Sequence, residues 1–341
     1  MRVLVTGGAG YIGSHTAALL AARGDFVVVL DSLEHGYRQA VGKLPLVVGN
    51  IRDGELVKEV LGDHKLEAVI HFAAYKAAGE SMSEPAKYFD NNVHGSLCLL
   101  EAARQAGVRR FVFSSTASVY GTPTTLPIRE SEALRPENPY GESKRIIEQM
   151  LFWFDACHGL RSAVLRYFNA AGAALDGENG EDPRHVANLI PVVMKVATGR
   201  TPVLRVFGTD YPTPDGSAIR DYIHVLDLAD AHARSLDFLA RHGRSEIFNV
   251  GTGHGASVLE VLGKARQITG QSIPAEMTGR RPGDPAVVYA DNRKAREVLG
   301  WSPRYGLDDI IASAWKWHAS HPDGFAIGVS SSPQARGPER R

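Results

Sequence analysis

Tyr140 and Lys144 are the residues of this sequence that point most directly to chemistry. They lie four positions apart in the segment from Asn138 to Lys144, and on a helix that spacing places the phenol and the ammonium on one face. A nearby cation favours the charged phenolate and so lowers the pKa of a phenol. The pair is therefore predicted to supply a general base that works near neutral pH.

A tyrosine and a lysine at this spacing are common on ordinary helices, where the tyrosine packs and the lysine is solvated, so the prediction needs further support. Thr116 supplies part of it. This residue follows the apolar run 111–114, and in a parallel α/β sheet ligands bind at the carboxyl ends of the strands. A single threonine at a strand end is usually structural, but together with Tyr140 and Lys144 it completes a set of three proton-handling side chains.

A glycine-rich loop near the start of the chain predicts a phosphate-binding site. Gly7, Gly10 and Gly13 follow a short apolar run and lead into a helix-like segment. Their spacing is a variant of the dinucleotide-binding pattern, in which small residues let the backbone approach a pyrophosphate at a helix N-terminus. Asp31 follows eighteen residues after Gly13. Its carboxylate can accept hydrogen bonds from a ribose diol and would repel a 2′-phosphate, so NAD is favoured over NADP.

Short runs that are apolar throughout alternate with helix-like segments along the first half of the chain. Such runs suit strands that are covered on both faces. The predicted strands are 3–5, 26–30, 46–48, 68–73, 111–114 and 163–168, and the predicted helices are 12–23, 54–61, 84–105 and 140–158. This alternation predicts an α/β fold with a Rossmann-type, doubly wound parallel sheet.

The pattern changes after about residue 169, where connectors rich in Gly and Pro separate shorter elements and predict a smaller α/β region that covers the substrate. Helix-like segments return at 225–241, 258–269 and 307–318. We therefore expect an NAD-binding domain at 1–168, joined by later segments at about 217–250, then a substrate-binding region at 169–324 and a flexible tail at 325–341.

The composition argues against several classes of function. Lys plus Arg and Asp plus Glu both number 38 in 341 residues, so no net charge attracts nucleic acid or an anionic membrane. The two cysteines, Cys98 and Cys157, provide neither a disulfide framework nor a metal-ligand pair at short spacing. Neither a signal-peptide core nor an apolar run of membrane-spanning length is found, so we expect a cytoplasmic protein without membrane or nucleic-acid partners and without a metal.

Five further segments, together with the glycine loop and the Tyr140 motif, carry a resemblance to a known family. They are Val69–Ala77, Asp90–Val93, Leu165–Asn169, Asp221–Ala229 and Arg280–Asp284. With these segments in this order, the chain from Val3 to about Pro322 resembles the extended short-chain dehydrogenase/reductases of the NAD-dependent epimerase/dehydratase family, and among them the UDP-sugar 4-epimerases.

The resemblance implies that one set of residues holds NAD and that a second set, mostly later in the chain, holds a UDP-sugar. The implied NAD-binding residues are Gly7, Gly10, Tyr11, Ile12, Gly13, Asp31, Asn50, Ile51, Phe72, Ala73, Ala74, Lys76, Asn91, Tyr140, Lys144 and Phe168. The implied substrate-binding residues are Thr116, Tyr140, Asn169, Asn188, Arg220, Arg281, Asp284 and Val288. Arginines suit a diphosphate because they form forked, charge-assisted hydrogen bonds. The resemblance also implies a homodimer, built through the predicted helices 84–105 and 140–158.

The two residues after Thr116 distinguish between reactions of the family. Related dehydratases carry Asp-Glu where this chain has Ala117 and Ser118, and related decarboxylases carry Glu at the position of Ser118. Eliminating water needs an added acid and base, so the resemblance implies oxidation and reduction at C4 without elimination. In that reaction the Tyr140 phenolate, assisted by Thr116, takes the O4 proton while hydride passes to NAD and returns to the other face of a 4-keto sugar.

Two positions leave the specificity open. Asn50 stands where the family usually has Asp near the adenine, although an amide oxygen can still accept a hydrogen bond. Val288 stands where the family varies between aromatic and small residues, so N-acetylated sugars are expected as substrates beside UDP-glucose and UDP-galactose. An epimerase of another UDP-sugar, such as UDP-xylose or a UDP-uronic acid, is the alternative. A non-catalytic NAD sensor is disfavoured, because it would not need Tyr140 and Lys144 together.

Overall fold

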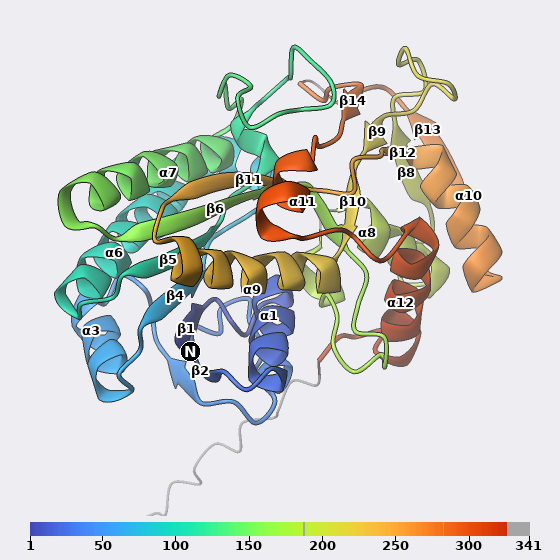
Figure 1. Cartoon of the computed structure of the whole chain (residues 1–341). Coiled ribbons are helices and arrows are strands. Elements are labelled where there is room, and N and C mark those ends of the chain that lie inside the picture. Colours follow the sequence, from blue (N-terminus) through green and yellow to red (C-terminus); the bar gives the residue numbers. More distant parts are fainter. Residues whose placement is uncertain (187, 282, 326–341) are drawn as a thin grey trace, which may run out of the picture.

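The computed structural model describes residues 1–186, 188–281 and 283–325. Its centre is a seven-stranded parallel sheet (Figure 1). In spatial order the strands are β11 (Glu246–Val250), β6 (Arg161–Tyr167), β5 (Arg110–Ser114), β4 (Ala68–His71), β1 (Arg2–Thr6), β2 (Phe26–Asp31) and β3 (Leu46–Val48). The chain runs outward from β1 in both directions, so the predicted doubly wound Rossmann-type fold is confirmed, with its switch point between β1 and β4.

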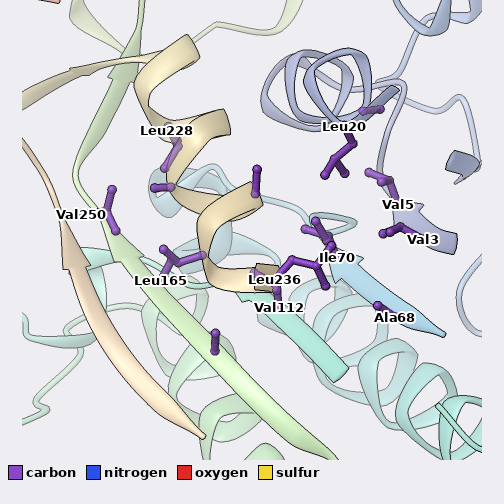
Figure 2. Packing of buried hydrophobic residues seen from close by; sticks show 14 of the residues in the cluster. Val3, Val5, Leu20, Ala68, Ile70, Val112, Leu165, Leu228, Leu236 and Val250 are labelled. Atoms are coloured by element: carbon purple, nitrogen blue, oxygen red, sulfur yellow. The ribbon is translucent and has the colours of Figure 1, made fainter. Parts of the chain in front are cut away.

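Helices cover both faces of this sheet, and alternate residues of each strand point to opposite faces. Val3 and Val5 pack with Leu20 and Leu236 on one face, as Figure 2 shows, whereas Leu4 packs into a separate cluster on the other. The first face carries α1 (Tyr11–Ala22) and α9 (Val225–His242), and the second carries α3 (Gly54–Asp63), α6 (Gly95–Gln105) and α7 (Pro139–His158). Burial on both faces explains why the strands are apolar throughout.

Helix α7 carries the predicted catalytic pair, and local signals fix where it begins and ends. The side chain of Asn138 accepts a hydrogen bond from the N–H of Gly141 at 2.8 Å, which caps the helix, and Pro139 takes the first helical position. Gly159 ends the helix in the left-handed conformation, with φ of +67°. The predicted helix 140–158 is thus found within one residue.

The predicted helix 84–105 is interrupted. It consists of α5 (Pro85–Tyr88), a π-helical turn η1 (Phe89–His94) and α6. The buried side chain of Asn92 lies in this turn, where it accepts from the N–H of Tyr75 at 2.9 Å and donates to Oγ of Ser143 at 3.1 Å. The wider turn therefore coincides with a polar residue that connects three segments of the fold.

The second part of the chain forms small sheets beside a group of helices. The strands pair as β7 (Asn169–Ala171) with β10 (Tyr222–His224), β9 (Ile219–Arg220) with both β12 (Ala256–Ser257) and β14 (Val287–Val288), and β8 (Leu204–Phe207) with β13 (Ala275–Thr278). The helices α8 (Leu189–Ala197), α10 (Val258–Thr269) and α12 (Leu307–Ser320) share one apolar core, which includes Val193, Leu262 and Ile311. Both α9 and β11 pack with the first sheet although they come late in the sequence.

Short elements complete the structure. They are α2 (Arg38–Val41), α4 (Ala78–Ser83), α11 (Arg293–Leu299) and the 3-10 turns Ala117–Val119 and Pro183–His185. Of the predicted flexible tail, residues 326–341 lie outside the described residues. Phe325 is only 8% exposed and stacks on Tyr37, so it belongs to the folded part, contrary to the prediction. None of the helices within the described ranges has the length and apolar composition needed to cross a membrane.

Candidate active site

The glycine loop joins β1 to α1 and brings backbone close to backbone. Gly7 has φ of +70°, and a Cβ there would lie 2.5 Å from the backbone N of Ala73. A Cβ on Gly13 would lie 2.2 Å from the carbonyl oxygen of Gly7. Gly10 is the N-cap of α1, so the unpaired N–H groups and the positive end of the helix dipole adjoin the loop. The loop is therefore a cradle for phosphate groups.

Asp31 ends β2 beside this loop. Its carboxylate accepts hydrogen bonds from the N–H of Ala9 at 2.9 Å and from the N–H of Leu33 at 2.8 Å. Burial raises the pKa of Asp31, and the two N–H groups oppose that change. The carboxylate is thus held in one orientation, and its remaining lone pairs can accept from the vicinal hydroxyls of a ribose.

A cavity of about 470 Å³ lies around the glycine loop and Asp31. Of the predicted substrate-binding residues, Asn188 also lines it. The predicted cofactor residues in its lining are Gly7, Gly10, Tyr11, Ile12, Gly13, Asp31, Asn50, Ile51, Phe72, Ala73, Ala74, Lys76 and Asn91. A glycine loop followed by a carboxylate fits a dinucleotide. Because the spaces beside Gly7 and Gly13 admit no side chain, the loop backbone is open to a pyrophosphate.

Several of these residues already have partners within the protein. The Lys76 ammonium donates to Oε1 of Glu181 at 2.7 Å, and Glu181 lines the same cavity, although its sequence context gave no sign of it. The amide oxygen of Asn50 accepts from the backbone N–H of Arg52 at 2.9 Å and from its Nε at 3.2 Å. The amide oxygen of Asn50 is therefore already paired within the protein.

Lys144 is buried at the carboxyl end of β5. Its ammonium donates to the carbonyl oxygen of Ser114 at 2.9 Å and lies 4.8 Å from the centre of the Phe113 ring. Burial lowers the pKa of Lys144 to about 7, and the nearby Glu148 carboxylate opposes that change. The ammonium is thus held in place by a backbone carbonyl and an aromatic face rather than by a carboxylate in direct contact.

The predicted lowering of the Tyr140 pKa is not what the structure shows. Burial raises the pKa of Tyr140 well above its usual value, Tyr167 adds to the increase, and a hydrogen bond with Thr116 opposes it. The physical reason is that Tyr140, only 7% exposed, loses the water that would solvate a phenolate. In the protein alone, burial therefore shifts both Tyr140 and Lys144 toward their neutral forms.

Thr116 lies near enough to Tyr140 to act on the pKa of the phenol. Thr116 follows β5, and its Oγ1 also accepts from the N–H of Ser118 at 3.1 Å, which fixes the 3-10 turn that follows. Asn92 connects this group to the cavity, because it bonds both to Tyr75 in the cavity wall and to Ser143 between the catalytic residues. Tyr140 and Lys144 are not themselves among the residues that line the cavity in the described part of the chain.

The predicted substrate-binding residues come from several small elements. Val288 in β14 pairs with Arg220 in β9, and the Arg220 guanidinium forms an ion pair with Asp284. The Arg281 guanidinium lies 3.8 Å from the centre of the Phe207 ring. The structure thus brings Arg220, Asp284 and Val288 together.

Two further predicted ligand-binding residues, Phe168 and Asn169, adjoin β9 and β14. The side-chain amide of Asn169 donates to the carbonyl oxygen of Asp221 at 3.1 Å. Phe168, predicted to contact the cofactor, is buried in a cluster with Tyr120 and Val119, against which Val288 packs. Val119 belongs to the turn that follows β5 and Thr116. This cluster therefore connects the carboxyl end of β5 to β14.

The sequence pattern of the family described as NAD dependent epimerase/dehydratase matches residues 3–251. The chain belongs to this family. A UDP-glucose 4-epimerase of Lacticaseibacillus casei is 49% identical over 327 residues, which are 95% of this chain and 99% of that protein. These relationships extend beyond the residues matched by the family pattern.

Solved structures of family members have the same fold. The UDP-glucose 4-epimerase of Brucella ovis in complex with NAD is 48% identical, with a TM-score of 0.90 over 92% of this chain and 97% of that one. The enzyme of Bifidobacterium longum, solved with NAD+ and UDP, is 42% identical, with a TM-score of 0.90 over 95% of this chain and 100% of that one.

In this member of the epimerase/dehydratase family, a buried ion pair supports the carboxyl end of β5, and sequence reasoning missed it. Glu148 lies one turn after Lys144 on α7 and pairs with Arg166 of β6, with Oε2 and Nη2 2.6 Å apart. Oε1 of Glu148 accepts from the hydroxyl of Ser115, next to Thr116, at 2.5 Å. A charged residue inside the otherwise apolar run of β6 was the available signal, since a buried arginine requires a partner.

Metal-ligating residues are not clustered in the part of the chain that the structure describes, where no group of three or more His, Cys, Asp and Glu side chains could hold an ion.

Proposed function

We propose that this chain is a UDP-glucose 4-epimerase that interconverts UDP-glucose and UDP-galactose with tightly bound NAD. The observation that carries the proposal is the connection between two sites. Tyr140 lies beside Thr116 and one turn from Lys144. Its backbone carbonyl oxygen accepts a hydrogen bond from Ser143, and Asn92 links Ser143 to the wall of the cavity around the glycine loop. Relatives nearly half identical over their full length bear the name of this activity.

Each catalytic side chain has a defined task in this reaction. Tyr140 takes the proton from the sugar O4, and the Thr116 hydroxyl holds that phenol by a hydrogen bond. Lys144, whose ammonium donates to the carbonyl oxygen of Ser114, is the cation proposed to favour the phenolate. NAD, when bound, supplies a hydride acceptor and a positive charge that favours the phenolate, which offsets the effect of burial on the Tyr140 pKa.

The two ligands occupy different parts of the molecule in this proposal. Residues 1–168, with segments of 217–250, supply most of the NAD site, and residues 169–324 hold the UDP group and add part of the wall of the NAD cavity. The Asp31 carboxylate accepts from a ribose of NAD, and the Gly7 to Gly13 loop receives the pyrophosphate. The remaining NAD contacts come from Tyr140, Lys144 and Phe168 beside the cavity residues described above. The UDP contacts come from Asn169, Asn188, Arg220, Arg281 and Asp284.

The sugar pocket is proposed to admit an N-acetyl group. Val288 is half-buried and packs against the cluster that contains Phe168 and Tyr120. A small side chain at this place leaves space where a tyrosine would project. We therefore propose that the N-acetylated UDP-sugars are substrates as well. An epimerase for UDP-xylose or a UDP-uronic acid is not favoured, because the relatives found at high identity are named for UDP-glucose.

The protein is further proposed to be a cytoplasmic homodimer. Large apolar side chains are exposed on the two helices predicted to form the dimer: Phe152 and Trp153 on α7 are 64% and 62% exposed, and Leu97 on α6 is 45% exposed. Ile146, Met150 and Phe154 line a groove beside them. Exposed apolar side chains on both helices support contact with a second copy. Sedimentation of a monomer alone would contradict this part of the proposal.

The direct test is an assay of the purified protein with no cofactor added. UDP-glucose, UDP-galactose and their N-acetylated forms are supplied one at a time, and the epimeric product is measured by chromatography. NAD released on denaturation is measured in the same preparation. We expect interconversion together with close to one NAD per chain. Protein that contains no NAD, binds none when it is added and is inactive would overturn the proposal.

A further inference from the structure

Three segments that are far apart in sequence meet at one wall of the dinucleotide cavity. They contribute Tyr37 from the loop after β2, Asp182 and Arg184 from the segment before α8, and Phe325 from the end of the described chain. All four side chains line the cavity. None of them belongs to the residues predicted from the family resemblance.

Phe325 is held by contacts on its ring and on both sides of its backbone. Its ring stacks on Tyr37, with centroids 5.2 Å apart and planes 27° apart, and packs on Trp317 at 4.9 Å. Its N–H donates to Oδ2 of Asp182 at 3.1 Å, and its carbonyl oxygen accepts from Nη2 of Arg184 at 3.0 Å. The contacts of its ring, its N–H and its carbonyl oxygen together hold Phe325 at the cavity wall.

The residues that hold Phe325 are themselves joined to one another. The Arg184 guanidinium lies 4.6 Å from the centre of the Tyr37 ring, and its Nε donates to Oδ1 of Asp182 at 2.8 Å. Gly324 has φ of +75°, and a Cβ there would lie 2.0 Å from Oδ2 of Asp182. Because residue 324 has no side chain, the backbone can pass close to Asp182, and Phe325 can reach the cavity wall.

Tyr37 connects this group to the loop that is proposed to bind NAD. Its N–H donates to the carbonyl oxygen of Ala9 at 2.9 Å, and the N–H of Ala9 donates to Asp31. A Cβ on Gly36 would lie 2.7 Å from Oδ1 of Asp31, so this stretch packs directly against the carboxylate. The group thus spans from the ribose-binding side of the cavity to the segment that carries Asn188.

We propose that Tyr37, Arg184 and Phe325 form a clasp that closes the adenosine side of the cavity and slows the release of NAD. This inference rests on the proposed function, in which NAD is regenerated in every turnover and does not need to dissociate. With the clasp formed, the ligand can depart only after the segment at 182–184 separates from the loop at Tyr37. Phe325 and Tyr37 are therefore residues that retain the cofactor and take no part in the reaction at the sugar.

The test compares NAD release from purified protein variants that carry NAD. Each protein is placed in an excess of isotopically labelled NAD, and the loss of unlabelled NAD is followed by mass spectrometry after denaturation. Phe325→Ala removes the stack on Tyr37 and Trp317, and we expect release about tenfold faster than from the wild type, a factor that corresponds to about 1.4 kcal/mol. Tyr37→Leu, at a half-buried position, is expected to act in the same direction.

Two further variants separate the clasp from a general loss of stability. Phe325→Tyr keeps the aromatic ring and should restore slow release. Phe26→Leu removes a partly exposed aromatic ring at the amino end of β2, away from the cavity lining, and should leave release unchanged. Release is measured well below the unfolding temperature of each protein.

The outcomes distinguish the clasp from the proposed function. If the wild type holds NAD and both Phe325→Ala and Tyr37→Leu release it at the wild-type rate, the clasp is wrong and the proposed function stands. The clasp is also wrong if Phe26→Leu accelerates release as much as Phe325→Ala does. Should the wild type neither contain nor bind NAD, the proposed function fails, and this inference fails with it.

Discussion

The region proposed to bind NAD and the region proposed to bind the UDP group differ in the contacts that build them. Around the glycine loop the contacts are made by backbone at close range, as at Gly13, where a Cβ would lie 2.2 Å from a carbonyl oxygen. On the other side, long side chains meet in pairs: Arg220 with Asp284, Arg280 with Asp210, and Arg281 with the Phe207 ring.

This difference has a mechanical consequence. The glycine loop cannot accommodate a new side chain by changing a rotamer, so a substitution there forces the backbone to shift. Paired side chains can exchange one partner for another, so the UDP side can rearrange around a ligand. We therefore expect large effects from small changes on the cofactor side and graded effects on the UDP side.

The largest loss of stability is expected at the ion pair that supports the carboxyl end of β5. Glu148→Gln leaves the Arg166 charge buried without its partner, which costs about 3–5 kcal/mol in the free energy of unfolding. Glu101→Gln, which breaks the exposed pair with Arg104, is the control and should cause no measurable change. Denaturant titration measures both. Equal, small losses in the two variants would show that Glu148 and Arg166 are not a buried unit.

The next largest effect is expected from a substitution in the glycine loop. Gly13→Ala places a methyl group against the carbonyl of Gly7, and relieving such a contact costs about 3 kcal/mol. NAD binding should therefore weaken about 100-fold, while UDP binding changes little. Calorimetric titration of each ligand separates the two. If NAD binds the variant as tightly as the wild type, the rigid-cradle side of the comparison fails.

A graded effect is expected on the UDP side. Arg281→Ala removes one exposed guanidinium, and losing a charge-assisted contact to a diphosphate should raise KM for UDP-glucose about 10–100-fold. The amount of bound NAD should stay the same. Arg241→Ala, in the last turn of α9, is a matched control at an exposed position. A loss of bound NAD in Arg281→Ala, with no change in KM, would reverse the assignment of the two sides.

The smallest effect concerns specificity. Val288→Tyr should lower kcat/KM for the N-acetylated substrates at least about tenfold relative to UDP-glucose, because the ring occupies the space proposed for the acetamido group. Val288→Ala keeps the position small and should preserve the wild-type ratio. Steady-state assays with both substrate pairs give the comparison. An unchanged ratio in Val288→Tyr would place the N-acetyl group elsewhere.

Features that depend on local sequence were the ones predicted well. The glycine loop, the strand that ends at Asp31 and the helix that carries Tyr140 all follow from short patterns, and the structure contains each of them. Features that depend on long-range packing were missed. Glu148 looks like an ordinary helix charge until Arg166 is seen beside it, and Phe325 begins a segment rich in Gly, Ser, Pro and Arg, with no pattern that marks it as buried.

The Tyr140 pKa illustrates a different limit. The spacing of Tyr140 and Lys144 predicts that the cation lowers the phenol pKa, but a spacing does not reveal how much water either group loses. In the folded chain burial dominates both groups, so the pKa of Tyr140 rises and that of Lys144 falls. Lys144 is not among the groups that shift the pKa of Tyr140, so the spacing predicted neither the direction of the shift nor its cause.

The central claim is that Tyr140 moves the proton while the cofactor stays in place, and Tyr140→Phe tests it most directly. Turnover of UDP-galactose and the NAD content are measured for wild-type and variant protein without added cofactor. We predict a loss of about 100- to 10,000-fold in kcat, the usual contribution of a general base, with NAD content equal to that of the wild type. Near-normal turnover in the variant would contradict the account.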